Sequence, residues 1–322
     1  MSKLEKISVG IRDSKLSIAQ TDILLNKLNS KAENVNISTF DIQTIKTKGD
    51  IHRNERLDQI GGKGLFIKEI EQQILSNKVD VGIHSMKDVP AEDNSNNLEI
   101  ICWLKRENPC DVLLSNSGHK FYELPAGSII GTSSIRRRAQ ILNLRKDLRV
   151  KLLRGNVDTR IKKLKEKHYD AIILSFAGLK RLRLLDHVTE ELHDKQFLPA
   201  ACQGTVGVQS KRGSNLKELF ALINHKETEV ESLTERQVLK NINANCNSPV
   251  SVYAKISENI ITVKCEIFDH DGNKLFSKEI VDKKDNSLIV ANTLSKKILD
   301  DIGQDKINKL DELNDFDYSP ST

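Results

Sequence analysis

The alternation of apolar and polar positions divides most of the chain into strands and helices that follow one another. Lys6–Ile11 alternates as a half-buried strand does, and it leads into a helix with Ile18, Leu24, Leu25 and Leu28 on one side. Further strands are predicted at Asn36–Ile45, Val79–Ile83, Leu98–Leu104, Asp111–Ser115, Ser128–Gly131, Arg149–Leu153, Ala171–Ser175 and Val206–Gln209. Most of these strands are followed by a helical pattern, which indicates right-handed βαβ units around largely parallel sheets.

The pattern changes near residue 250. Val250–Ile256, Ile260–Phe268 and Lys274–Asp282 are predicted strands in succession, Asp271-Gly272 is typical of a hairpin turn, and Leu288–Ile302 is a predicted helix. The fold class is therefore α/β, with two βαβ domains and a small α+β domain at the C-terminal end. We expect domain 1 at residues 1–104 and 201–224, domain 2 at 105–200, domain 3 at 225–305, and a disordered tail at 306–322.

The segment Val79–Pro90 is the centre of the pattern. Pro90 cannot extend a central strand, so the residues before it form a loop that leaves the carboxyl end of the strand. In open α/β sheets ligands bind at that end, which makes Asp88 and Lys87 candidate functional residues beside His84 and Ser85. The alternative interpretation is a solvated turn with a surface ion pair.

A cationic residue follows a predicted strand at four places, Arg12, Arg136, Arg154 and Arg181. The carboxyl ends of parallel strands lie on one edge of a sheet, so these arginines are predicted to converge there. Ser133 or Ser134 is predicted to cap a helix whose first turn holds three arginines, 136 to 138, and positive charge there opposes the helix dipole. Positive charge in a first helical turn is more readily tolerated where it meets an anion, and the planar guanidinium of arginine binds carboxylates through paired hydrogen bonds. A basic exposed helix face or a nucleic-acid patch are the alternatives.

The glycine-rich segment from Lys46 to Gly64 suggests a mobile loop or lid, and it leads into a helix with Ile67, Ile70 and Ile74 on one face. Lys63 is followed by Gly64 where a phosphate-binding loop requires Ser or Thr, which excludes nucleoside triphosphate binding by that motif.

Composition narrows the function further. The 322 residues are 38% hydrophobic and 30% charged with a net charge of +5, as in a soluble globular protein, and aromatics at 4% offer few platforms for stacking bases. The residues after Met1 lack the apolar core of a signal peptide, and no apolar run is long enough to span a membrane. The five cysteines contain no C-x-x-C pair, which favours a reducing cytosol without a disulfide framework or a metal site. Cys246, on a polar loop, is a weak nucleophile candidate, whereas Cys102 and Cys265 lie in predicted strands.

Five segments together resemble the porphobilinogen deaminase family of tetrapyrrole biosynthesis, over about Ile7 to Leu299. The segments are Gly61-Gly62-Lys63-Gly64-Leu65-Phe66, His84-Ser85-Met86-Lys87-Asp88-Val89-Pro90, Gly131-Thr132-Ser133-Ser134-Ile135-Arg136-Arg137, Leu153-Arg154-Gly155-Asn156-Val157 with Thr159-Arg160, and Ala177-Gly178-Leu179-Lys180-Arg181.

The resemblance implies two domains shaped like periplasmic solute-binding domains with the site between them, and a third domain that carries a cofactor. One dipyrromethane per chain would be joined by a thioether to Cys246, and four porphobilinogen molecules would be added to it in turn with loss of ammonia. The resemblance also assigns roles. Asp88 is the catalytic position; the cofactor-binding positions are Ser85, Lys87, Thr132, Ser134, Arg136, Arg137 and Arg160; the substrate-binding positions are Arg12, Ser14, Arg154, Arg181 and Gln203; and the lid positions are Lys63 and Phe66.

Some positions depart from the commoner family pattern. Asn245 and Asn247 flank Cys246 where glycine and glutamine are usual, Cys202 stands where glycine is common, and Lys15 stands where proline is common. The resemblance implies a cytoplasmic, monomeric transferase without nucleic-acid, membrane or metal partners. The alternative is a non-enzymatic cytosolic protein that binds small carboxylic acids with the same two-lobed fold.

Overall fold

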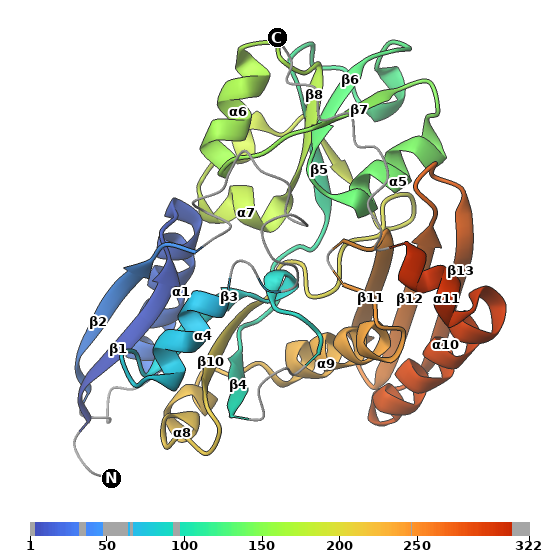
Figure 1. Cartoon of the computed structure of the whole chain (residues 1–322). Helices are drawn as coiled ribbons and strands as arrows, with labels where there is room; N and C mark the ends of the chain where they lie inside the picture. The colour runs from blue at the N-terminus through green and yellow to red at the C-terminus, as the bar shows by residue number, and fades with distance from the viewer. Residues whose placement is uncertain are drawn as a thin grey trace. The chain divides into compact units, whose positions relative to one another are not determined.

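A computed structural model describes residues 4–31, 37–47, 64, 67–92, 97–245 and 247–310. The chain divides into two compact units, the first made of residues 1–107 and 205–229 and the second of residues 108–204 and 230–322 (Figure 1). The predicted domain 1 and the first unit have similar bounds. Predicted domains 2 and 3 lie in the second unit except for residues 105–107 and 225–229, and their separation from each other stays a prediction.

The first unit is built on a mixed five-stranded sheet in the order β2-β1-β3-β10-β4. Its strands are β1 (Leu4–Arg12), β2 (Ile37–Ile45), β3 (Val81–Ser85), β4 (Leu98–Trp103) and β10 (Val206–Lys211), and its helices are α1 (Lys15–Lys31), α4 (Lys68–Leu75) and α8 (Leu216–Ala221). β1, β2 and β3 are parallel, whereas β10 is antiparallel to both of its neighbours.

The second unit contains a five-stranded sheet with the same topology, in the order β7-β6-β8-β5-β9. Its strands are β5 (Asp111–Ser115), β6 (Ile129–Thr132), β7 (Arg149–Leu152), β8 (Ala171–Ser175) and β9 (Glu190–Leu192), and its helices are α5 (Ile135–Leu144), α6 (Val157–Lys165) and α7 (Phe176–Arg181). β5 is antiparallel to its neighbours, as β10 is in the other sheet. Each of these two strands follows a point where the chain passes from one unit to the other, which explains the shared reversal.

The predicted α+β domain is also present in the second unit. An antiparallel sheet of β11 (Val250–Ser257), β12 (Ile260–Phe268) and β13 (Lys274–Lys283) packs its apolar residues against α10 (Ser287–Ile302). α9 (Lys226–Asn241) precedes this sheet, and α11 (Gln304–Lys309) follows α10. The predicted α/β fold class with two βαβ domains and a small α+β domain is therefore confirmed.

Two details of the prediction are wrong. Ile18 is 43% exposed, because the buried face of α1 begins with Ser17, Gln20 and Thr21 and only then continues with leucines. The tail does not begin at residue 306, because α11 runs to Lys309 and buries Ile307 against the core of the α+β domain. Residues 311–322 lie outside the described residues. Among the described helices, none is long and apolar enough to span a membrane.

Candidate active site

In the first unit, the predicted loop after β3 is confirmed. Val81 and Ile83 are buried in the sheet, and a 3₁₀ turn, η1 (Met86–Asp88), follows directly. Met86 is buried and its backbone amide donates to the carbonyl of Thr205 at 3.0 Å, which holds the turn against the sheet. Lys87 and Asp88 remain partly exposed as a result.

Asp88 lies opposite Arg12, which ends the neighbouring strand β1. The Asp88 Oδ2 atom is 3.8 Å from Arg12 Nη1, and the two side chains are 32% and 23% exposed. Because β1 and β3 are parallel neighbours, their carboxyl ends share one edge of the sheet. The sequence placed both residues at strand ends, and the structure brings a partly exposed carboxylate and a guanidinium together there.

Two serines lie on the same edge. Ser14 caps α1, since its hydroxyl accepts a hydrogen bond from the amide of Ser17 at 3.1 Å. The side-chain amide of Gln20, a buried residue of α1, donates a hydrogen bond to the hydroxyl of Ser85 at 2.8 Å. Gln20, on the buried polar face of α1, therefore helps to hold Ser85 in place at this edge of the sheet.

His84, four residues before Asp88, is unsuited to acid–base chemistry. Its side chain is 3% exposed, and Nε2 lies 3.0 Å from Oε1 of Gln209, whose amide donates to Glu71. Burial lowers the pKa of His84 to about 4, so the imidazole is neutral near pH 7. It acts as a structural residue between β3 and β10.

In the second unit, the predicted helix cap is confirmed at Ser134. Its hydroxyl accepts a hydrogen bond from the amide of Arg137 at 3.4 Å, and the amide of Ser134 donates to the hydroxyl of Thr132 at 3.2 Å. Both hydroxyls lie at the carboxyl end of β6 where α5 begins. The turn that joins strand to helix is thus fixed by its own side chains.

The anion that the arginines of α5 were predicted to meet is present within the chain, and it is Asp111. Arg136 Nη2 lies 2.7 Å from Asp111 Oδ2, and Arg137 Nη2 lies 2.6 Å from Oδ1. All three side chains are buried, and the two guanidinium groups hold the pKa of Asp111 far below its usual range against the cost of burial. Sequence analysis missed Asp111, although an acidic residue at the start of an apolar strand was a signal for a buried charge pair.

Arg138 differs from its neighbours. Its side chain donates a hydrogen bond to the carbonyl of His270 in the turn between β12 and β13. Asn143, further along α5, donates to the carbonyl of Gly272 in the same turn at 2.8 Å. α5 therefore carries the arginine pair at its start and contacts the α+β domain along its length.

The remaining predicted positions of this unit are Arg154 after β7, Arg160 in α6, Arg181 at the end of α7 and Gln203 shortly before β10. Arg181 donates to the carbonyl of Gly204 at 2.6 Å, and Gln203 donates to Asp111 at 2.9 Å. Arg160 donates to the carbonyl of Gly155 at 2.7 Å, in the loop that also holds Arg154. Arg136 and Arg181 both donate to carbonyls of the segment Leu198–Gly204, and the convergence of the four arginines on one edge stays a prediction.

Three predicted positions, Cys246, Lys63 and Phe66, lie outside the described residues. The residues on either side of Cys246 form a turn in which the Asn245 side chain accepts from the amide of Asn247 at 2.8 Å. The hydroxyl of Ser248 accepts from the amide of Asn245 at 2.9 Å. Within the described part of the chain, no group of three or more His, Cys, Asp or Glu is placed to hold a metal ion.

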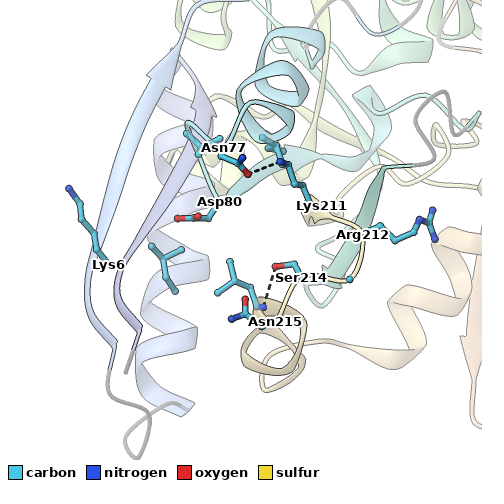
Figure 2. A pocket seen from close by; sticks show the side chains of 12 residues that line it. Lys6, Asn77, Asp80, Lys211, Arg212, Ser214 and Asn215 are labelled. Carbon is cyan, nitrogen blue, oxygen red and sulfur yellow. Dashed lines mark hydrogen bonds between the residues drawn. The ribbon is translucent and has the colours of Figure 1, made fainter. Parts of the chain in front are cut away.

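A separate pocket of about 310 Å³ lies in the first unit, at the other edge of its sheet (Figure 2). Its lining includes Lys6 in the first half of β1, Asp80 just before β3 and Lys211 at the end of β10. Lys211 donates to Asn77 at 2.6 Å, and Asp80 accepts from the hydroxyl of Ser8 at 2.6 Å. Lys211, Asn77 and Asp80 therefore each have a hydrogen-bond partner within the protein.

Comparison with known proteins identifies the family. Residues 7–218 match the family model described as "Porphobilinogen deaminase, dipyromethane cofactor binding domain", and residues 229–300 match that of the porphobilinogen deaminase C-terminal domain. The porphobilinogen deaminase of Shouchella clausii (strain KSM-K16) is 44% identical over 257 residues, which cover 79% of this chain and 81% of the relative. That of Bacillus cereus (strain ZK / E33L) is 42% identical over 281 residues, or 86% of this chain and 90% of the relative.

Solved structures with a similar arrangement are more distant in sequence. Substrate binding domain 2 of Lactococcus lactis GlnP is 12% identical with a TM-score of 0.40, covering 70% of this chain and 88% of that one. The periplasmic VFT2 domain of Bordetella pertussis BvgS is 12% identical with a TM-score of 0.41, covering 73% and 92%. The two family models and the extent of sequence identity show that the chain belongs to the porphobilinogen deaminase family.

Proposed function

We propose that this chain is a working porphobilinogen deaminase, a transferase that condenses four porphobilinogen molecules into the linear tetrapyrrole hydroxymethylbilane and releases ammonia. The observation that carries the proposal is the partly exposed Asp88 carboxylate beside Arg12 at the edge of the first sheet, in a chain of this family. A carboxylate at this edge stabilises positive charge that develops during the reaction, and a guanidinium binds the carboxylates of the substrate.

The residues of the second unit fit a dipyrromethane cofactor, whose acetate and propionate side chains are anionic. Arg136, Arg137 and Asp111 sum to one net positive charge. The Nε atom of Arg136 is buried and donates to no acceptor among the described residues, so the cluster keeps donor capacity. Thr132 and Ser134 add hydroxyls at the start of α5. We infer that these residues hold the cofactor with Ser85, Lys87 and Arg160, and that Cys246 forms the thioether.

When bound, dipyrromethane supplies the primer to which substrate units are joined. The chain's own residues bind and orient each substrate, since Arg12, Ser14, Arg154 and Arg181 offer donors for its two carboxylates, with Gln203 beside them. Asp88 stabilises the cation left when the aminomethyl group of the substrate loses ammonia. Its carboxylate then accepts the proton that the attacked pyrrole carbon releases as the new carbon–carbon bond forms.

We further propose that the enzyme is cytoplasmic and monomeric and has no nucleic-acid or membrane partner. Lys63 and Phe66 are proposed to belong to a lid over the site. These assignments follow from family membership and stay predictions.

Turnover separates the enzyme from the alternative carboxylic-acid-binding protein. Purified protein incubated with porphobilinogen should release one ammonia for each porphobilinogen consumed and yield a linear tetrapyrrole by mass spectrometry. Reversible binding of porphobilinogen without ammonia release would refute the proposed activity and support the binding protein.

A further inference from the structure

The arginine pair of α5 is held by a side chain that has no assigned role in the reaction. Asp111, the first residue of β5, is 0% exposed and accepts hydrogen bonds from Arg136, Arg137 and Gln203. Arg137 donates to it through both Nε, at 3.0 Å, and Nη2, at 2.6 Å. Asp111 is therefore the common acceptor of three residues that family membership places in the cofactor and substrate sites.

One further donor of each arginine is directed at the protein backbone. Arg136 Nη1 donates to the carbonyl of Leu198 at 2.7 Å, and Arg137 Nη1 donates to the carbonyl of Ile173 at 3.0 Å. The two side chains are only 4% and 6% exposed. In this arrangement the guanidinium groups anchor the first turn of α5, and most of their donors are used within the protein.

The anchored turn also holds the two hydroxyls that the proposed function assigns to the cofactor site. The amide of Arg137 donates to the Ser134 hydroxyl, and the amide of Ser134 donates to the Thr132 hydroxyl. Two adjacent buried cations in a first helical turn repel each other and oppose the helix dipole, so without a buried anion this turn would not keep its form. The position of Thr132 and Ser134 thus depends on Asp111 through the arginine pair.

Asp111 lies shortly after the point where the chain first enters the second unit, and its partner Gln203 lies just before the point where the chain returns to the first unit. Gln203 donates to Asp111 and to the carbonyl of Pro109, at 2.6 Å, and so joins the incoming segment to the outgoing one. A single carboxylate therefore binds the arginines at the start of α5 and, through Gln203, links two of the segments at which the chain passes between the units.

We propose that Asp111 is a positioning residue of the cofactor site. It clamps Arg136 and Arg137 so that the start of α5 is preorganised for an anionic pyrrole ligand, and it leaves one unit of positive charge beside that ligand. The inference rests on the proposed function, since it assumes that the ligand is dipyrromethane.

The test follows cofactor loading in the full-length chain, separately from turnover. Apoprotein made in a host that cannot synthesise porphobilinogen is incubated with porphobilinogen, and intact mass gives the loaded fraction against time. The variants are Asp111→Asn, Asp111→Glu and the control Asp147→Asn, which removes an exposed partner of Arg145 in the same unit. Thermal midpoints of the apoproteins are measured in parallel, and loading is followed well below them.

Asp111→Asn should load about tenfold more slowly or worse, the loss expected when charge-assisted hydrogen bonds no longer fix a binding group. Asp111→Glu, which keeps the charge, should recover part of the rate, and Asp147→Asn should load as the wild type does. A purely structural role predicts a lower midpoint for Asp111→Asn with loading at the wild-type rate, and that result would overturn the inference. Wild-type protein that never loads would instead refute the proposed function.

If neither Asp111 variant folds, a measurement on the wild-type protein still tests the inference. Side-chain ¹⁵N resonances of Arg136 and Arg137, assigned in the apoprotein, should both shift on loading, because the clamp lies against the ligand's charge. Resonances that stay unchanged in fully loaded protein would overturn the inference.

Discussion

Replacing Asp88 by Asn separates chemistry from stability at the candidate site. The variant keeps the size of the side chain and its ability to accept a hydrogen bond, and removes the charge. The ion pair with Arg12 is long, at 3.8 Å, and both partners are partly exposed, so its loss should cost no more than about 1 kcal/mol of unfolding free energy.

The effect on the reaction should be much larger. A carboxylate that stabilises developing cations and moves protons is worth about a hundredfold to ten-thousandfold in rate, or roughly 2.7 to 5.5 kcal/mol of barrier. His84 cannot take over this work, because burial lowers its pKa to about 4 and it contacts Gln209 inside the sheet.

The assay is single-turnover ammonia release by cofactor-loaded protein, with urea unfolding of the same samples. Asp41→Asn is the matched control, since Asp41 also pairs with one cation, Lys6, at 3.2 Å in the first unit. The control should keep wild-type rate and stability. A near-wild-type rate for loaded Asp88→Asn would refute the assignment of Asp88 to the chemistry, and severe unfolding of this variant would show that the ion pair had been misjudged.

Three further predictions concern buried groups and backbone. His84 has a folded pKa of about 4, below its usual value, so the unfolded chain binds the extra proton first and stability falls as the pH drops from 6.5 towards 4. The unfolding free energy of the wild type should fall by about 3 kcal/mol over this pH range, and that of His84→Gln should not, as urea unfolding would show. Equal pH profiles of stability for the two proteins would contradict the buried neutral imidazole. Gly272→Ala should cost at least about 2 kcal/mol, because its Cβ would lie 2.7 Å from the backbone nitrogen of Asn143. Gly127→Ala, also at positive φ but with no atom within 4 Å, should cost only about 1 kcal/mol of unfolding free energy. If Gly272→Ala and Gly127→Ala lost the same stability, backbone strain at positive φ would explain both losses and the contact with Asn143 would be refuted as a cause. Cys202→Gly should unfold within about 1 kcal/mol of the wild type and stay active, because relief of the positive φ of 58° offsets the lost burial; a larger loss in urea would contradict that balance.

The sequence predicted those parts of the site that depend on local chemistry. The loop Ser85–Asp88 follows from a short apolar strand that ends before Pro90, and the cap at Ser134 follows from a hydroxyl before an apolar helix face. Both features are set by residues within a few positions of one another, which is why pattern analysis located them.

What the sequence did not predict depends on contacts between distant residues. Asp111 meets Arg136 and Arg137 only because β5 and α5 pack together, and nothing in the spacing of 25 or 26 residues specifies that contact. Ile18 was placed on the wrong face because the buried stripe of α1 starts with polar side chains, one of which binds Ser85. Arg138 contacts His270, a pairing across 132 residues that a helical repeat cannot indicate.

The central claim is that the chain carries a covalent dipyrromethane and uses it as primer. The most direct test is the intact mass of the purified wild-type protein beside that of Cys246→Ala, with peptide mapping of the cysteine loop. The wild type should be heavier than its sequence by one dipyrromethane on the peptide that contains Cys246, and the variant should have the mass of its sequence alone. Active wild-type protein with unmodified Cys246 would contradict the account.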